Sequence, residues 1–241
     1  MFVRARSVLL VALALSPSAC TKKKDDAVDL AGLRPITMEI VLVDDDLDPF
    51  AKPGGTLPES VSVRAEERLS RSGFPATFRY AMLVKKPGET YVQAKERFSP
   101  WLSTLPLPAG RRFVLGDVME EDETGQPRAI GLRTYVVARE AIVTHANVVD
   151  AIVLEDDGKG PVQPPVVVVT FDAAGGERFH AATREHVKER LAIVVSDKAM
   201  SVPLVQSPIP GGRVSISMHG HDDRAVAEAR RLAVALRGKP R

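Results

Sequence analysis

Apolar side chains recur at every second position near the start of the N-terminal half. This period predicts a strand over residues 36–44, which ends in a run of aspartates. Further strands are predicted over 78–84, 112–119 and 130–138. The last two flank the polar segment EDETGQP, so they are predicted to form a hairpin.

Two helices are predicted between these strands. Residues 59–71 have helical composition, and Val61, Ala65 and Leu69 are spaced four apart. A second helix begins after Pro87 and Gly88, and we interpret its apolar stripe as core. Pro100 is expected to split this helix, with Ser99 capping the second piece. The stripe consists of Ala94, Phe98, Trp101, Leu102 and Leu105.

The C-terminal half has the most regular pattern. A short turn through His145 and Asn147 leads to a predicted strand over 151–154, and the run VVVVTF over 166–171 predicts a strand that is buried on both faces. Asp172 is placed to cap a helix that ends near residue 187. Three strands, over 191–195, 199–205 and 213–218, and a final helix over 223–237 complete the pattern.

This order of elements, β-α-β-β-β-α, predicts an α+β fold. The helices are expected to form one layer that packs on a mixed, mostly antiparallel sheet. The final helix should face the sheet with Val226, Ala229, Ala233 and Leu236.

Charge and composition exclude one class of function. The chain of 241 residues has 33 Lys plus Arg and 31 Asp plus Glu, and two of the basic residues, Arg4 and Arg6, lie within the first 19 positions. The remainder is therefore balanced, with 31 charges of each sign. A neutral body with 5% aromatic residues argues against nucleic-acid binding, which needs a positive surface and usually stacking rings.

The first twenty residues have the pattern of a secretory signal. A short basic stretch precedes an apolar run over 8–15, which is too short to span a bilayer, and small residues follow it. Cys20, the single cysteine, comes after Ser18 and Ala19, and this segment resembles the lipobox of bacterial lipoproteins, with Pro17 in place of the usual leucine. The alternative is an ordinary secreted protein with a free thiol.

The lipobox resemblance implies that residues 1–19 are removed and that Cys20 carries acyl chains such as palmitate. Thr21 in the next position implies sorting to the outer membrane, facing the periplasm. Residues 20–35 are polar and charged, so we expect them to be a flexible tether.

Several short motifs over 166–238 occur together in one order. They are FDAAGGERF, RLAIVVSDK, MSVP, SPIPGG, VSIS and EARRLAVALRG. In this order they resemble the head subdomain of the first periplasmic domain (P1) of SecD, an accessory subunit of protein export. The resemblance continues more faintly upstream, in TYVVAREAIVTHANVVDAIV and ITMEIVLVDDD. The turn of the family motif comprises Pro208, Ile209, Pro210, Gly211 and Gly212.

The resemblance implies a head-like domain over 129–238, preceded by an N-terminal α+β region over 36–128. The pattern leaves open whether that region is a separate domain or an extension of the same sheet. The chain departs from the family where Ser196 and Asp197 replace the usual Asp-Gly turn and where the insert MHGHDDRAV precedes the last helix. After residue 20, no segment is apolar enough to cross a membrane, whereas SecD has several such helices, which couple export to the proton gradient.

The SecD resemblance implies a module that faces the periplasm and contacts translocon components or exported polypeptide. Together with the lipobox resemblance, it gives the interpretation of a lipid-anchored, non-enzymatic protein. Strand edges can accept an extended peptide by backbone pairing, which needs no particular side chain. The alternative is a generic envelope scaffold that reuses the head fold without a role in translocation.

Residues with catalytic or metal-binding character are few, and we expect no cofactor. His219 and His221 could face one metal ion on an extended segment, but a solvated turn before a helix explains them equally well. Gly175 and Gly176 are expected to allow close packing rather than to bind phosphate, since neither a G-x-G-x-x-G nor a P-loop pattern is present. A hydrolase or metal-dependent enzyme remains the third alternative.

Overall fold

The computed structural model describes residues 36–51, 56–123, 125–156 and 163–237 of the chain. The elements of the N-terminal half are β1 (Met38–Val43), β2 (Val61–Leu69), β3 (Pro75–Val84), α1 (Tyr91–Leu102), β4 (Arg111–Glu121) and β5 (Pro127–Thr144). A short 3-10 helix (His145–Asn147) leads into β6 (Val148–Leu154), β7 (Val166–Phe171), α2 (Ala173–Glu185), β8 (Leu191–Val195), β9 (Lys198–Ser201), β10 (Arg213–Ser217) and α3 (Asp223–Arg237). The mixed, mostly antiparallel sheets confirm the α+β class.

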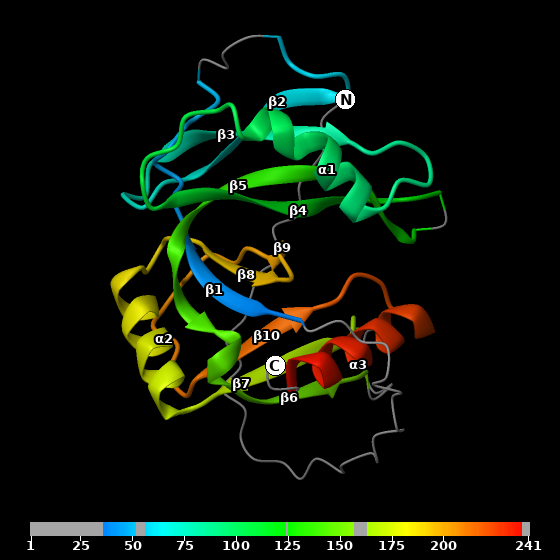
Figure 1. Ribbon diagram of the computed structural model, residues 1–241. Helices are drawn as coiled ribbons and strands as arrows, with labels where there is room; N and C mark the ends of the chain where they lie inside the picture. Colours follow the sequence, from blue (N-terminus) through cyan, green and yellow to red (C-terminus); the bar gives the residue numbers. More distant parts are fainter. Residues whose placement is uncertain (1–35, 52–55, 124, 157–162, 238–241) are drawn as a thin grey trace.

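Three layers follow one another in Figure 1. The hairpin β2–β3 and helix α1 lie at the top, strands β1, β8 and β9 lie in the middle below β4 and β5, and the small sheet β10-β7-β6 lies at the bottom with α2 and α3. The predicted β-α-β-β-β-α order is correct, but its strands belong to two sheets. β8 and β9 pair within the seven-stranded sheet, whereas β7 and β10 pair with each other.

Five strands of the larger sheet close into a ring. The hydrogen-bonded order runs β1-β8-β9-β4-β5, and β5 pairs again with β1. The long strand β5 makes this possible, because its first half pairs with β3 and its second half with β1. The ring therefore joins strands from residues 36–128 with strands from residues 129–238 in one sheet.

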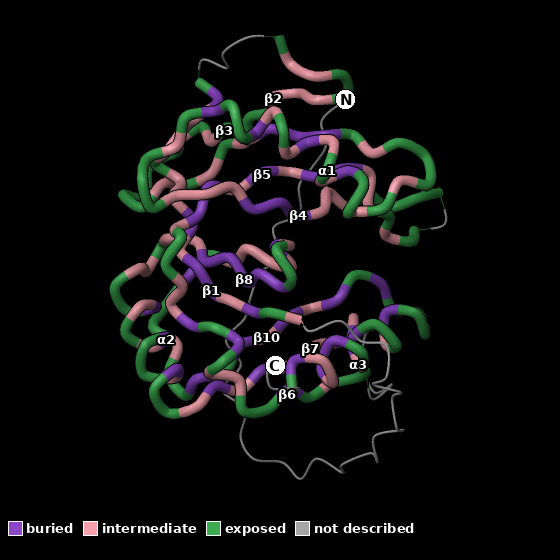
Figure 2. The backbone as a smooth tube through the Cα atoms, viewed as in Figure 1, coloured by how far each residue is buried: buried purple, intermediate pink, exposed green. Residues whose placement is uncertain are grey.

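The interior of the ring is filled by small apolar side chains. All five strands contribute to this cluster: Val41 and Val43 from β1, Val114 from β4, Val137 from β5, Ala192 and Val194 from β8, and Ala199 from β9. Gly116 brings β9 close to β4, because a Cβ atom there would lie only 3.1 Å from the Ala199 carbonyl oxygen. Figure 2 shows the buried residues concentrated in these strands.

Two further cores lie outside the ring. Below it, the outward side of β1 and β8 packs with α2, α3 and the small sheet, around residues such as Ile40, Ile193 and Phe179. Above it, α1 packs on β3, β4 and β5 around Phe98. β1 and β8 thus have apolar side chains on both faces.

The predicted helix over 59–71 is wrong, because this segment is strand β2. It pairs residue by residue with β3, from Val61 opposite Leu83 to Leu69 opposite Pro75. The charged residues that gave it helical composition alternate along the strand, so that Glu66 and Arg68 reach the same cluster of ion pairs. Tertiary contacts override the local helical preference here.

The predicted split of the next helix is also wrong, because α1 is continuous through Pro100. The helix ends only two residues later, so the ring of Pro100 disturbs only the last turn. Ser99 does not cap a second piece, since its hydroxyl donates to the Lys95 carbonyl oxygen at 2.7 Å. The helix begins instead with a capping box in which Thr90 and Gln93 bond reciprocally.

The hairpin β4–β5, the Asp172 cap of α2 and the final helix α3 are confirmed. The predicted strand over 199–205 is too long, because β9 ends at Ser201 and only an isolated bridge joins Arg190 to Leu204. The turn before β9 is built from two residues with positive φ, Ser196 at 47° and Asp197 at 64°. This geometry suits a tight two-residue hairpin turn.

A cluster of ion pairs ties the hairpin β2–β3 to the ring. Asp45, just after β1, accepts hydrogen bonds from Arg190 Nε at 2.9 Å and Arg68 Nη1 at 2.9 Å. Glu66 on β2 accepts two bonds from Arg133 on β5, each of 3.1 Å. We call Asp45, Glu66, Arg68, Arg133 and Arg190 the arginine cluster.

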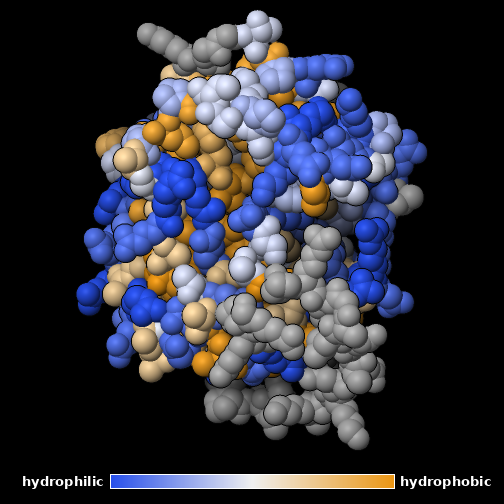
Figure 3. Space-filling view, viewed as in Figure 1, coloured by the Kyte–Doolittle hydropathy of each residue, from blue (hydrophilic) through white to orange (hydrophobic). Residues whose placement is uncertain are grey.

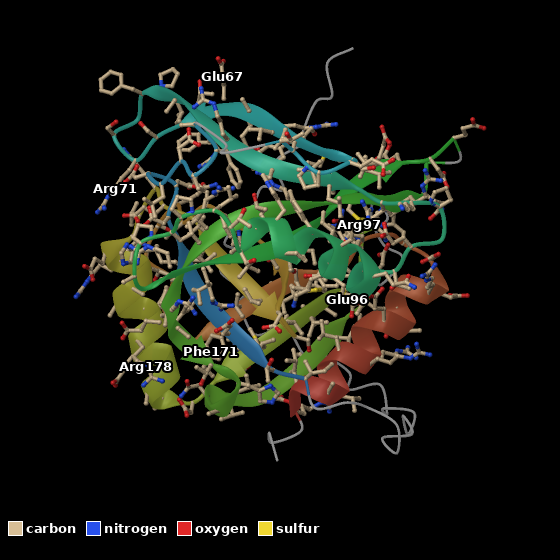
Figure 4. The ribbon with its side chains drawn as sticks, turned by 45° about the horizontal axis from the view of Figure 1, so that its top comes forward. Glu67, Arg71, Glu96, Arg97, Phe171 and Arg178 are labelled. Atoms are coloured by element: carbon tan, nitrogen blue, oxygen red, sulfur yellow. The ribbon has the colours of Figure 1, made fainter. Side chains whose placement is uncertain are left out.

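A second ion pair, formed by Arg71, fixes the tip of the same hairpin. Arg71 Nη1 lies 2.5 Å from a carboxylate oxygen of Glu189, which follows α2, and its Nη2 is 3.4 Å from the Glu185 carbonyl oxygen. Figure 4 shows Arg71 on the side of the molecule where α2 lies, whereas Glu67 projects from the outside of the hairpin. The tip of the hairpin is therefore held by ion pairs, whereas its other end lies in the upper core through Ala81 and Leu83.

Stability should fall in acid because of the arginine cluster. Burial alone raises the pKa of Asp45, but the hydrogen bonds and charges of Arg190 and Arg68 outweigh it and hold that pKa below its usual value. Arg133 likewise outweighs burial and lowers the pKa of Glu66. Because both folded-state pKa values lie below the ordinary values of 3.8 for Asp45 and 4.5 for Glu66, this stabilisation is complete above about pH 6. It is lost as the pH falls through the ordinary values and then through the folded-state values.

Urea unfolding followed by circular dichroism between neutral and acid pH measures this loss. An Asp45→Asn variant should be less stable at pH 7 by about 3 kcal/mol, because Arg68 and Arg190 lose their shared counter-charge. The deficit should shrink in acid, and the exposed neighbour Asp46→Asn is the control, with an expected change within about 0.5 kcal/mol. Equal stability of Asp45→Asn and the wild type at pH 7 would contradict the assignment.

Candidate functional site

The small sheet β10-β7-β6 has one covered and one open face. On the covered face, Val167, Val169 and Phe171 of the central strand are buried in the core with α2 and α3. The alternate residues Val166, Val168 and Thr170 are only half-buried. Among the described residues no helix or strand packs over this second side, which we call the open face.

The pairing register places apolar side chains in adjacent rows on the open face. Leu154 lies opposite Val166, and Ile152 lies opposite Val168. Leu154 is 39% exposed and Ile152 is 44% exposed. β10 contributes Ser217 and Ser215 to the same two rows, so the apolar part of the face lies over β7 and β6.

The open face departs from the sequence prediction for this strand. A continuous run of valines was expected to be buried on both sides, but the burial of β7 alternates between buried and intermediate. Val166 and Val168 point outward and form an exposed apolar surface. In the sequence they look the same as the valines of the core, so the exposed surface could not be predicted. The exposed residues of β6 carry the same ambiguity.

Both outer strands of this sheet have a free edge. Within the described part of the chain, β6 and β10 each pair only with β7. The edge of β6 is partly blocked, because the Ala151 amide donates to the Asp150 carboxylate at 2.9 Å. Val149, which is 60% exposed, lies at the irregularity in pairing between Val148 and Asp150. Such a bulge also discourages strand addition.

Other exposed apolar residues do not form a comparable surface. Phe74 and Leu69, 72% and 63% exposed, lie together at the tip of the hairpin β2–β3. Figure 3 shows hydrophilic residues gathered over α1 and apolar residues surfacing in a strip beside it. The open face differs because its side chains stand on a regular sheet next to a free strand edge. That combination suits an extended peptide, which pairs by backbone and places alternate side chains on the sheet.

The motif turn predicted from the sequence lies at the other end of the small sheet. Gly211 and Gly212 have φ of 86° and 61°, which favours glycine at both positions. The Gly212 carbonyl oxygen accepts from the Phe171 amide at 2.8 Å, and the Ile209 amide donates to Thr183 Oγ1 at 3.0 Å. The turn containing Pro208 and Pro210 is thus hydrogen-bonded both to β7 and to helix α2.

The paired glycines at the start of α2 lie against this turn. A Cβ atom on Gly176 would approach the Gly212 Cα atom to 3.3 Å, and one on Gly175 would meet the Asn147 Cβ atom at 2.8 Å. The first contact is with backbone and the second is with the Asn147 side chain, so both glycines allow close packing. The Gly175 amide is occupied by the capping Asp172 carboxylate at 2.6 Å.

His219 and His221 are exposed on the link between β10 and α3. Partial loss of solvation and the nearby Lys198 charge lower the pKa of His219. Asp222 accepts the Ala225 amide at 2.9 Å and so caps α3. Over the residues that the structure describes, no three His, Cys, Asp or Glu side chains are grouped to hold a metal ion. Cys20 lies outside the described residues.

A polar contact between α1, β4 and the turn before β9 could not be predicted from the sequence. The Tyr91 hydroxyl lies 3.2 Å from the carbonyl oxygens of both Leu115 and Asp197. Burial first, and then the charges of Asp117 and Asp197, raise the pKa of Tyr91. Lys198 Nζ lies 2.5 Å from an Asp117 carboxylate oxygen in the same region. The residues are far apart in sequence, so only the fold brings them together.

Comparison with protein families identifies the C-terminal half. The model of the SecDF P1 head subdomain matches residues 117–239, which is just over half of the chain. The chain belongs to the SecDF P1 head family. The match covers the small sheet with its open face, the motif turn, α2 and α3. None of the helices that the structure describes is long and apolar enough to span a membrane.

Several curated relatives are similar to part of the chain. The protein translocase subunit SecD of Magnetococcus marinus is 51% identical over 73 residues, 30% of this chain and 13% of that protein. The SecD of Calditerrivibrio nitroreducens is 33% identical over 103 residues, 43% of this chain and 19% of that protein. That of Treponema pallidum is 32% identical over 136 residues, 56% and 21% of the two chains. The chain thus spans a minor part of the length of these relatives.

Solved structures of SecDF are also similar. A chain described under "Structure and function of a membrane component SecDF that enhances protein export" is 16% identical, with a TM-score of 0.35, and the match covers 83% of this chain and 92% of that chain. A crystal structure of SecDF in a super-membrane-facing form has the same identity, 16%, and the same TM-score, 0.35, over 84% of this chain and 28% of that chain.

Alanine substitutions in the motif turn should separate strain from packing. Gly211 and Gly212 both have positive φ, but a Cβ atom on Gly211 meets nothing within 4 Å, whereas one on Gly212 would lie 2.9 Å from the Gly176 Cα atom. Gly211→Ala is expected to cost about 1 kcal/mol for backbone strain alone. Gly212→Ala should cost at least about 1 kcal/mol more, because α2 must move. Urea unfolding of both variants measures the difference, and equal losses would refute the packing role.

Proposed function

We propose that this chain is a non-enzymatic accessory of protein export that faces the cell envelope and binds extended polypeptide on the open face of its head domain. Membership of the SecDF P1 head family supports a role in export, since the curated relatives are named protein translocase subunits. The chain matches only a minor part of those relatives. The proposal therefore concerns polypeptide binding and does not extend to the whole translocase.

The observation that carries the proposal is the exposed apolar pairing of β6 with β7. Ile152 and Leu154 are exposed next to the half-buried Val168 and Val166, and the adjoining strand edge is free in part. Covering a partly exposed aliphatic side chain contributes about 1 kcal/mol, so four such residues give modest affinity. Modest affinity without side-chain specificity suits transient contact with many sequences.

Direct contact can be tested by photocrosslinking. A photoreactive amino acid at position 152, in the full chain in cells, should capture translocon subunits or exported chains during secretion. The same probe at position 92 is the control, because Val92 on α1 is also an exposed aliphatic residue, 59% exposed. Crosslinks of equal yield and identity at both positions, or none to export components at 152, would reject the proposal.

Affinity can be tested by charging the open face. The double substitution Ile152→Lys and Leu154→Lys should weaken binding of a labelled unfolded polypeptide at least about tenfold, measured by fluorescence anisotropy. Val92→Lys should leave binding unchanged. Circular dichroism spectra should match in all three proteins, since the substituted side chains are exposed. Unchanged affinity in the folded double variant would count against the open face as the site.

The envelope location rests on the first twenty residues. We propose that Cys20 is acylated and anchors the chain, because it follows the small residues Ser18 and Ala19 after an apolar run. Intact mass spectrometry of the protein purified from membranes should show removal of residues 1–19 and added acyl mass. A Cys20→Ser variant should lose membrane association. An intact leader with an unmodified thiol would exclude the anchor.

One observation favours the alternative of a generic envelope scaffold. The Asp150 carboxylate occupies the Ala151 amide, so part of the β6 edge is closed to an incoming strand. A scaffold needs no such edge. A deletion strain with normal export and altered envelope integrity would support this alternative, whereas slowed export with an intact envelope would support polypeptide binding.

A further inference from the structure

The outermost strand of the seven-stranded sheet, β2, has a free edge. The strand order ends at β5-β3-β2, and among the described elements β2 pairs only with β3. In Figure 1 this strand lies at the upper end of the molecule, away from the small sheet and its open face. One edge of a nine-residue strand is therefore left without a partner strand.

The hydrogen bonds of the hairpin show which backbone groups point to this edge. The Ser70 amide donates to the Phe74 carbonyl oxygen at 2.8 Å, and the Val84 amide donates to the Ser60 carbonyl oxygen at 2.9 Å. Both bonds follow the register of β2 with β3. Because bonded and non-bonded pairs alternate along an antiparallel ladder, the even-numbered residues of β2 bond to β3. The odd-numbered residues direct their amide and carbonyl groups outward.

The outward groups form a regular edge that lacks the usual protection. Within the described chain, Val61 alone among them has a further backbone bond, from its amide to the Pro58 carbonyl oxygen at 3.1 Å. β2 contains no proline and no lysine, and its pairing with β3 has no bulge. Proteins use such features to stop strand edges from pairing. The open backbone groups belong to Val63, Ala65, Glu67 and Leu69.

The charges of β2 are complementary when the strand meets a second copy of itself. In an antiparallel pair with a two-fold axis at Ala65, Arg64 of each copy lies opposite Glu66 of the other. All nine residues pair in this register, and no like charges are opposed. The backbone-bonded pairs are then formed by outward residues: Ala65 with Ala65, Val63 with Glu67, and Val61 with Leu69.

The neighbouring registers bring like charges together. Sliding one copy in one direction places Arg64 opposite Arg64, and sliding it in the other direction places Glu66 opposite Glu66. Directly opposed like charges destabilise a strand pair, whereas opposite charges stabilise it. The sequence of β2 therefore selects the register centred on Ala65.

The two charges that meet in this register have room for each other. Arg64 is exposed and has no carboxylate partner within the described chain, and its Nε lies 3.5 Å from the Ser62 hydroxyl oxygen. Glu66 accepts hydrogen bonds from Arg133 and Arg68. A carboxylate has about four acceptor positions, so one is left after these three bonds.

We propose that two copies of this chain pair through the free edge of β2, so that their sheets become continuous across the two-fold axis. Leu69, which is 63% exposed, then lies opposite Val61 of the other copy, and pairing removes apolar surface from water. One strand edge forms a small interface, so the dimer is reversible. This surface is independent of the open face and of Cys20.

Photocrosslinking between two tagged forms of the full chain tests the pairing in cells. A photoreactive amino acid replaces Ala65 in one form, and a crosslink should join the two tags. Mass spectrometry should locate the crosslink near residue 65 of the second copy. The control probe is at position 227, because Ala227 is an exposed alanine on α3, far from β2.

Charge reversal tests the register. Arg64→Glu places a carboxylate opposite Glu66 on both sides of the axis, so the yield of the crosslink at position 65 should fall at least about tenfold. Arg224→Glu, the same reversal at an exposed residue of α3, should leave the yield unchanged. Circular dichroism spectra of both variants should match that of the wild type, since the substituted side chains are exposed.

Three results would overturn the proposal. The first is a crosslink at position 65 that joins the tags no more often than one at position 227. The second is capture of a different protein at position 65 without a second copy, because the edge would then serve another partner. The third is a yield that Arg64→Glu and Arg224→Glu reduce equally or not at all.

Discussion

The fold depends on the pairing of β1 at both of its edges. This six-residue strand lies between β5 and β8, and its pairing with both closes the ring. Its side chains are apolar on both sides, with Ile40 in the lower core and Val41 in the ring interior. A strand without a polar face can lie only between two cores. Loss of β1 would therefore open the ring and expose both cores at once.

The hairpin β2–β3 follows a different physical principle. One end of it is anchored in the upper core by Ala81 and Leu83, but its tip is positioned by the arginine cluster and by Arg71, whose partners lie on separate elements. Apolar contacts tolerate small displacements, whereas bidentate guanidinium–carboxylate bonds fix distance and direction. Net stabilisation by such pairs is small, because each charge loses solvation, so we infer that the pairs mainly set the position of the hairpin.

The sequence predicted most elements, and its failures have physical causes. Alternation identified β1, and the Asp172 cap with the small-residue stripe identified α2 and α3. The segment of β2 failed because Glu66 and Arg68 look like residues of an exposed helix until their partners are known. Pro100 was given too much weight, because its disruption falls where α1 ends anyway.

The candidate site was less predictable than the fold. The family motifs pointed to the motif turn, which proves to be packing between Gly212 and Gly176. The open face went unrecognised because outward and inward valines are identical in a run such as VVVV. Whether an outward valine is buried depends on whether another layer covers that face of the sheet. The sequence does not show that β8 and β9 belong to the larger sheet and not to the small one. The arginine cluster joins residues up to 145 positions apart, so the spacing of charged residues along the sequence could not predict it.

The apolar open face and the partly blocked edge of β6 beside it can both serve the binding of an extended chain. An antiparallel sheet that faces water usually carries polar residues on that side, and an apolar face next to a free edge invites pairing between copies of the chain. Here the Asp150 carboxylate and the bulge near Val149 restrict the edge, whereas the face itself stays apolar. The sheet is thus protected against the long, regular pairing that leads to aggregation. Short or irregular contact with an extended chain is still permitted, because it uses the side-chain rows and only the unblocked part of the edge.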